Sequence, residues 1–211
     1  MNEHDWSREE LQKYSDEMIA VTVPVNIRIE GKQKILDLKT AEILLKKARV
    51  ISVGNCDCRE RWKKCDSPLD VCLGLDGKAE DLIEQGHAKK ISAKQALDVL
   101  KRTHKAGLVH LAFTTKGEEK TDYICSCCSC CCHALSAIVR FNMPYAVSTP
   151  ERVAIQDREK CTHCGTCVQR CQFHARRIAD GKLVFDSGKC FGCGLCASTC
   201  PNGAIFFMKR S

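Results

Sequence analysis

The stretch CTHCGTCVQRC, residues 161–171, decides the fold of the C-terminal part of this chain, because CFGCGLCASTC, residues 190–200, repeats its pattern 29 residues later. Both copies read C-x-x-C-x-x-C-x-x-x-C, and Gly165 recurs as Gly194. A repeated cysteine run of this kind indicates an internal duplication. Two copies are too few for a stacked repeat array, so the duplication predicts one compact unit with two related sites.

The spacing within each run predicts the chemistry of these sites. Three thiolates placed three residues apart converge on one [4Fe–4S] cube if the backbone wraps around it, and the fourth cysteine then reaches the other cluster. Gly165 and Gly194 assist, because glycine adopts positive φ and allows amides to approach the sulfides. Zinc sites usually space two C-x-x-C pairs by a dozen or more residues, which does not fit four cysteines within eleven.

Residues 151–211 therefore resemble the two-cluster bacterial-type ferredoxins. The resemblance implies two cofactor-binding sets, which are Cys161, Cys164, Cys167 and Cys200 for one cluster, and Cys190, Cys193, Cys196 and Cys171 for the other. Pro201 follows Cys200 as the family pattern expects, whereas Gln172 follows Cys171. Proline constrains the backbone there and is no ligand, so we expect this difference to affect local geometry or potential and not ligation.

Ten further cysteines form two groups in the sequence, and we expect all of them to bind metal. They are Cys56, Cys58, Cys65 and Cys72 in the first group, and Cys125, Cys127, Cys128, Cys130, Cys131 and Cys132 in the second. One or two thiolate-bound centres joining both groups are predicted, either additional [4Fe–4S] clusters or structural zinc, since four sulfur ligands suit both. Some members are alternatively free or redox-active thiols.

The order of motifs also resembles a group of anaerobe proteins known chiefly as "4Fe–4S binding protein". A C-x-C-R stretch at residues 56–59, a C-D-x-P stretch from Cys65, an A-G-L-V-H segment, the cysteine run and the duplicated tail follow one another over roughly residues 20–210. The resemblance implies redox work alongside a larger anaerobic oxidoreductase.

Composition sets the general class. The chain has 211 residues, with 44% hydrophobic and 28% charged residues, which is typical of a globular protein. No stretch approaches the roughly 18 apolar residues of a membrane helix, and the N-terminus does not read as a signal peptide. Eighteen cysteines without an export signal indicate metal ligation in a reducing cytoplasm. We therefore expect a cytoplasmic protein.

The charge does not indicate a nucleic-acid partner. The formal net charge is +7, but each cluster with four thiolates contributes −2, so it falls to +3 with two clusters and to −1 with four. Lysines and arginines are scattered, and aromatic residues make up 6%.

Periodicity predicts an α+β fold: a cysteine-rich α/β domain over residues 1–150 and a dicluster ferredoxin-like domain over residues 151–211. We expect one helix to begin at Ser7, which starts a capping box, and another at Ser92, which caps it. Further helices are expected over residues 40–49 and over a segment through Leu135 and Val139. Expected strands cover residues 21–29, 50–53 and 108–113. Two prolines, Pro144 and Pro150, predict a linker before the second domain.

Four histidines and two arginines have competing interpretations. We interpret His110 as a core histidine more readily than a ligand, and His133 as a weak ligand candidate; His163 and His174 are expected at the surface, where they tune cluster potential. Arg59 and Arg61 lie beside Cys56 and Cys58 in the sequence and could stabilise thiolates, although Arg61 fits a solvated basic face equally well.

No catalytic residues are assigned, because the chain shows no Ser–His–Asp set, P-loop or dinucleotide-binding motif. The sequence favours an iron–sulfur electron carrier or oxidoreductase subunit that passes single electrons to or from a larger redox partner. Two alternatives remain open: a reductase with an open-site cluster in the N-terminal half, and a zinc-stabilised docking module carrying a ferredoxin.

Overall fold

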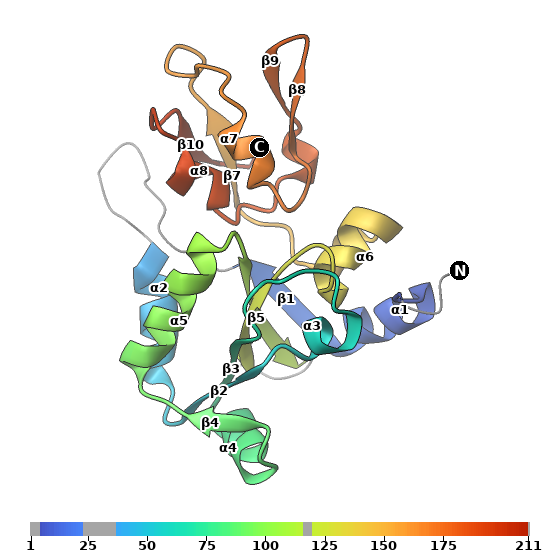
Figure 1. Ribbon diagram of the computed structural model, residues 1–211, viewed down its shortest axis with the longest axis vertical. Coiled ribbons are helices and arrows are strands. Elements are labelled where there is room, and N and C mark those ends of the chain that lie inside the picture. Colours follow the sequence, from blue (N-terminus) through green and yellow to red (C-terminus); the bar gives the residue numbers. More distant parts are fainter. Residues whose placement is uncertain (1–4, 23–36, 116–119, 211) are drawn as a thin grey trace.

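The computed structural model describes residues 5–22, 37–115 and 120–210, and it shows an α+β protein (Figure 1). The N-terminal elements, in chain order, are α1 (Arg8–Glu17), β1 (Met18–Thr22), α2 (Asp37–Lys47), β2 (Ile51–Asn55), α3 (Asp57–Trp62), β3 (Asp70–Leu75), α4 (Asp76–Glu84), β4 (Ala88–Lys90), α5 (Ala93–Lys105), β5 (Val109–Thr115), β6 (Tyr123–Cys127), α6 (His133–Phe141) and the 3₁₀ turn η1 (Pro144–Ala146). The C-terminal elements are β7 (Arg152–Gln156), α7 (Thr166–Gln169), β8 (Arg176–Ala179), β9 (Lys182–Phe185), the 3₁₀ turn η2 (Ser187–Lys189), α8 (Leu195–Thr199) and β10 (Ile205–Lys209).

Within the described ranges, the N-terminal strands form one antiparallel sheet in the order β1-β5-β6-β3-β2-β4. The β6 strand lies at its centre and pairs Cys125 with Leu111 and Cys127 with Val109 on β5. On its other side, Ile124 pairs with Leu73 of β3. Because side chains alternate between the faces of a strand, Cys125 and Cys127 share one face of the sheet with Cys72.

The two faces of this sheet bury different side chains. One face packs on α2 and α5, with Leu45, Leu73, Leu100 and Ile124 fully or almost fully buried. The other face carries the strand cysteines among apolar residues such as Leu111, beneath α6. Figure 1 shows α2 and α5 on one side of the strands and α1, α3 and α6 on the other. The second face is therefore where the cysteines gather.

Local sequence signals correctly predicted the start of two helices. Both Ser7 and Ser92 cap α1 and α5 with complete capping boxes, as expected. Met18 follows α1 directly; its spacing from Leu11 and Tyr14 is that of a helix, but it begins β1 and pairs with Thr115. Of the strand expected over residues 21–29, only residues 21 and 22 are described, and both lie in β1; the rest falls outside the described residues.

The segment expected to be a linker is packed. Residues Pro144–Ala146 form η1, and the next residue, Val147, is 1% exposed in the same core as Leu111. Proline disfavours regular helix and strand because its ring restricts the backbone and removes the amide donor. The chain between Pro144 and Pro150 is nevertheless held in place by buried apolar side chains and is not a free connector.

The C-terminal elements form two small antiparallel sheets, one of β7 with β10 and one of β8 with β9. Short helices α7 and α8 follow Gly165 and Gly194, whose φ angles are 78° and 84°. These positive angles are the reason for glycine at this point of each repeat.

Candidate metal centres

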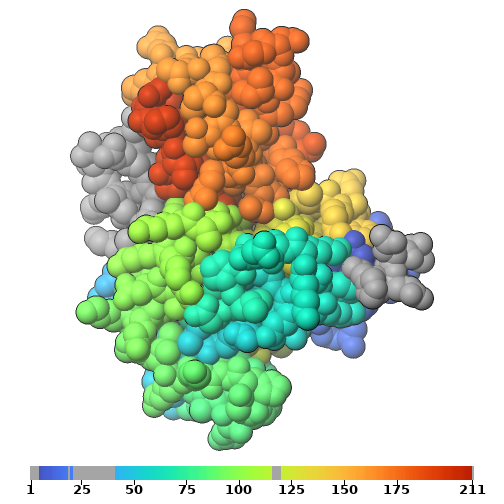
Figure 2. Space-filling model, in the orientation of Figure 1, coloured from blue at the N-terminus to red at the C-terminus, as the bar shows by residue number. Residues whose placement is uncertain are grey.

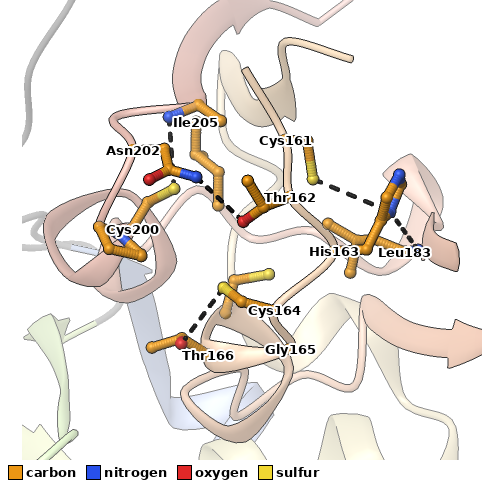
Figure 3. A pocket seen from close by; sticks show the side chains of 13 residues that line it. Cys161, Thr162, His163, Cys164, Gly165, Thr166, Leu183, Cys200, Asn202 and Ile205 are labelled. Atoms are coloured by element: carbon orange, nitrogen blue, oxygen red, sulfur yellow. Dashed lines mark hydrogen bonds between the residues drawn. The ribbon is translucent and has the colours of Figure 1, made fainter. Parts of the chain in front are cut away.

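Two cavities in the C-terminal region are each lined by four cysteines. The outer cavity is lined by Cys161, Cys164, Cys167 and Cys200, among other residues. Figure 3 shows the labelled cysteine side chains arranged around it, with Asn202 donating to Thr162 at 3.0 Å beside them. Cys164 is exposed, so this cavity lies close to solvent.

The inner cavity is lined by Cys171, Cys190, Cys193 and Cys196. Unlike the outer cavity, it faces the N-terminal half, because Phe173 and Phe191 of its lining belong to the same buried cluster as Leu111 and Cys127. The structure thus brings each fourth cysteine to the cavity of the other run, which is the arrangement that the ferredoxin resemblance implies.

The backbone around the two cavities fits anionic sulfur. The amide of Ala175 donates to the sulfur of Cys171, and the amide of Ala204 donates to that of Cys200, both at 3.3 Å. Such donors stabilise thiolate over thiol. Four cysteines, a positive-φ glycine and inward amides are what a [4Fe–4S] cluster requires, so the residues present fit that group.

Four of the ten N-terminal cysteines form a compact set, here called the four-thiol group: Cys65, Cys128, Cys130 and Cys131. Their sulfur atoms all lie within 4.8 Å of one another, and the sulfurs of Cys65 and Cys128 are 3.7 Å apart. Hydrogen bonding with Cys130, helped by the guanidinium of Arg59, lowers the pKa of Cys128 to about 4.

The other N-terminal cysteines form a more extended set, here called the six-thiol group: Cys56, Cys58, Cys72, Cys125, Cys127 and Cys132. Thiol–thiol contacts connect Cys56 to Cys72, Cys72 to Cys125, Cys125 to Cys127 and Cys127 to Cys132. Cys58 lies beside Cys132 and accepts a hydrogen bond from the backbone of His133. Both groups contain cysteines from both cysteine stretches of the sequence. This is the arrangement expected for metal centres that join the two stretches.

Arg59 and Arg61 differ in environment, although only one residue separates them. Arg59 is 1% exposed; it donates to the carbonyl oxygens of Pro68 and Ser126 and to the sulfur of Cys128. Arg61 is an exposed side chain that pairs with Glu10 at 2.7 Å and lies over the ring of Trp62. Arg59 therefore takes the thiolate-stabilising position, and Arg61 follows the surface interpretation.

The histidines are placed largely as expected. His110 is 2% exposed and its Nδ1 lies 3.0 Å from the hydroxyl of Ser126, on the sheet face opposite Cys125 and Cys127. His133 packs against the ring of Tyr14 at 4.4 Å. His163 and His174 are exposed, and Nδ1 of His163 accepts from the amide of Leu183 at 2.9 Å.

A polar contact between the two halves was not anticipated from the sequence, and Gln172 is at its centre. The Gln172 Oε1 accepts from the amide of Ser129 at 3.0 Å and from its hydroxyl at 2.8 Å, while Nε2 donates to the carbonyl of Gly107 at 3.1 Å. Arg170 adds bonds to the carbonyls of His104 and Lys105. Figure 2 shows the C-terminal residues resting on the surface that α5 and α6 form. The signal in the sequence that could have indicated this contact is Gln172 itself, which stands where the ferredoxin pattern expects proline.

Comparison with known proteins identifies the C-terminal region. Residues 154–177 and 183–206 each match the family described as "4Fe-4S binding domain". This region is a dicluster ferredoxin domain, and it follows a cysteine-rich N-terminal region; the iron–sulfur motifs indicate an electron-transfer role. No curated protein matches the chain. Within the part of the chain that the structure describes, no helix is long and apolar enough to cross a membrane.

Proposed function

We propose that this protein passes single electrons, in anaerobic metabolism, between a partner oxidoreductase and the metal centres of its N-terminal half. Cys161, Cys164, Cys167 and Cys200 would hold one [4Fe–4S] cluster in the outer cavity, and Cys190, Cys193, Cys196 and Cys171 a second one in the inner cavity. When bound, these clusters accept and release one electron at a time.

One observation carries this proposal: the thiol sites follow one another from the surface to the interior. The outer cavity includes the exposed Cys164, and the inner cavity packs through Phe173 and Phe191 against the cluster that contains Cys127 and Cys132. A partner would dock at the outer cavity, where a cluster lies close to solvent. The chain's own residues then bury the inner site and orient it towards the N-terminal thiols.

The count of thiols favours a carrier over a reductase with an open iron. The six-thiol group supplies more than the four thiolates that one cluster needs, which favours a cluster in which every iron has a thiolate ligand. All 18 cysteines are free, which supports the proposal of a reducing, cytoplasmic location. We place the boundary between the two domains near residue 150, just before β7.

The test is an anaerobic reductive titration of the purified chain, followed by EPR. The expected result is reversible one-electron signals at low potential, electron delivery to cytochrome c as a general one-electron acceptor, and no change of any signal on adding cyanide. A cyanide-dependent shift confined to an N-terminal centre would show an open iron and overturn the carrier proposal in favour of the reductase. Loss of electron delivery in a Cys164→Ala variant would locate the exit at the outer cavity; unchanged delivery would place it elsewhere and contradict the route.

A further inference from the structure

The compactness of the four-thiol group restricts what it can bind. In a tetrahedral site with metal–sulfur bonds of about 2.3 Å, neighbouring sulfurs lie about 3.8 Å apart. The 3.7 Å between Cys65 and Cys128, and the 4.8 Å limit on all four, match that geometry. A [4Fe–4S] cluster needs a wider set, because each thiolate binds a different iron on the outside of the cube.

The surroundings of the group are partly buried and suited to anionic sulfur. Cys128 and Cys131 are buried next to Leu108, which is 1% exposed. Trp6 donates to the carbonyl of Cys131 at 2.8 Å, and the amide of Lys64 donates to its sulfur. Four thiolates around a divalent ion leave a charge of −2, and the buried guanidinium of Arg59 at Cys128 offsets part of it.

The same loop receives the ferredoxin domain. Ser129 lies between two members of the four-thiol group, and both its amide and its hydroxyl donate to Gln172. Fixing the sulfurs on either side of Ser129 also fixes the direction of these two donors, since the intervening backbone is only one residue long.

We propose that Cys65, Cys128, Cys130 and Cys131 bind a single divalent metal ion, Zn²⁺ or Fe²⁺, in a tetrahedral site, and that this ion holds the loop on which Gln172 docks. The six-thiol group is then the place for an iron–sulfur cluster in the N-terminal half. The assignment stands on the geometry of the four sulfurs and does not depend on the proposed electron transfer.

Metal and sulfide analysis of the full chain, purified without oxygen, tests the proposal. The Cys65→Ala variant is expected to lose about one metal ion per chain and no inorganic sulfide. The matched control is Cys164→Ala in the outer cavity, in which iron and sulfide are expected to fall together, because that cavity holds a cluster of four irons. Joint loss of iron and sulfide in Cys65→Ala, with the EPR signals of the ferredoxin domain retained, would overturn the single-ion assignment.

A measurement on the unaltered chain keeps the proposal testable if Cys65→Ala does not fold. Zinc near one per chain, with four sulfur neighbours at about 2.3 Å in its X-ray absorption spectrum, is expected for Zn²⁺. An isolated high-spin ferric EPR signal after oxidation is expected instead for iron. The absence of both signatures would overturn the proposal.

In a folded Cys65→Ala chain, the amide of Ser129 should exchange hydrogen faster than in the unaltered chain; an unchanged rate would refute the link between the ion and docking.

Discussion

Replacing Gln172 with proline should separate ligation from docking. The other repeat has Pro201 at the equivalent position, so proline is compatible with the cysteine run there, and we expect Gln172→Pro to keep both ferredoxin clusters. The variant cannot make the three hydrogen bonds that Gln172 forms with Ser129 and Gly107.

The size of the effect follows from these bonds. A hydrogen bond contributes about 0.5–1.5 kcal/mol net, and both Gln172 and Ser129 are only partly buried, which favours the lower half of that range. Three bonds then stabilise docking by about 2 kcal/mol, which is about a 30-fold change in the equilibrium between docked and separated domains. Arg170 and the apolar contacts of Phe173 remain, so most molecules should still be docked.

Hydrogen exchange of the Ser129 amide measures this change directly, because that amide donates to Gln172. We expect it to exchange up to about 30-fold faster in Gln172→Pro and Gln172→Ala, with iron and sulfide unchanged. Gln169→Ala is the control, since Gln169 is exposed on α7 and no bond from its side chain is described. Equal Ser129 exchange in all these variants would refute the docking role, and loss of iron in Gln172→Pro alone would show that the glutamine supports ligation.

Three further predictions concern the ferredoxin domain and its contact with α5. Cys171→Ala should remove the EPR signal of the inner cluster and Cys200→Ala that of the outer one; the reverse result would show that each run serves its own cavity. His174, exposed at φ 53°, takes the place of Gly203 at φ 58° in the other repeat, so His174→Gly should stabilise the chain by about 1 kcal/mol in denaturant unfolding, and a destabilised variant would contradict this. Burial lowers the pKa of His104 from 6.5 to about 4, so the unfolded chain binds more protons between these values. The contribution of His104 to the free energy of unfolding is therefore largest above pH 6.5 and should fall by about 1 kcal/mol from pH 7 to 5.5. A His104→Gln variant whose free energy of unfolding shows the same pH dependence as that of the unaltered chain would refute the assignment.

The cysteine runs of the ferredoxin domain could be predicted from the sequence because their chemistry is local. The ligand spacing and the positive-φ glycine lie within each eleven-residue run, and the second run repeats the first 29 residues later. The helices that begin after Ser7 and Ser92 were equally accessible, since a capping box spans only four residues.

The grouping of the ten N-terminal cysteines could not be predicted, because it depends on long-range pairing. Alternation along β6 suffices to place Cys125 and Cys127 on one face. Which thiols from the earlier stretch join them depends on the register of β3 against β6, where Leu73 meets Ile124. The register brings Cys72 to that face, whereas Cys65 lies in the loop before β3 and joins the other group.

Arg59 shows why metal binding and folding of the N-terminal half are coupled. Its guanidinium is 1% exposed and, among the described residues, has no carboxylate partner; two backbone carbonyls and the sulfur of Cys128 accept from it. A buried charge without a counter-charge is strongly destabilising. Although burial opposes its charge, the nearby thiolates of Cys56, Cys128 and Cys127 hold the pKa of Arg59 above its usual range. These thiolates belong to both thiol groups, and thiols become thiolates when they bind metal. Without metal, Cys56 and Cys127 would be protonated, because hydrogen bonds to neighbouring thiols and burial raise their pKa, and Cys128 would be the remaining counter-charge. Loading both groups with metal therefore stabilises the charge of Arg59 and, with it, this core.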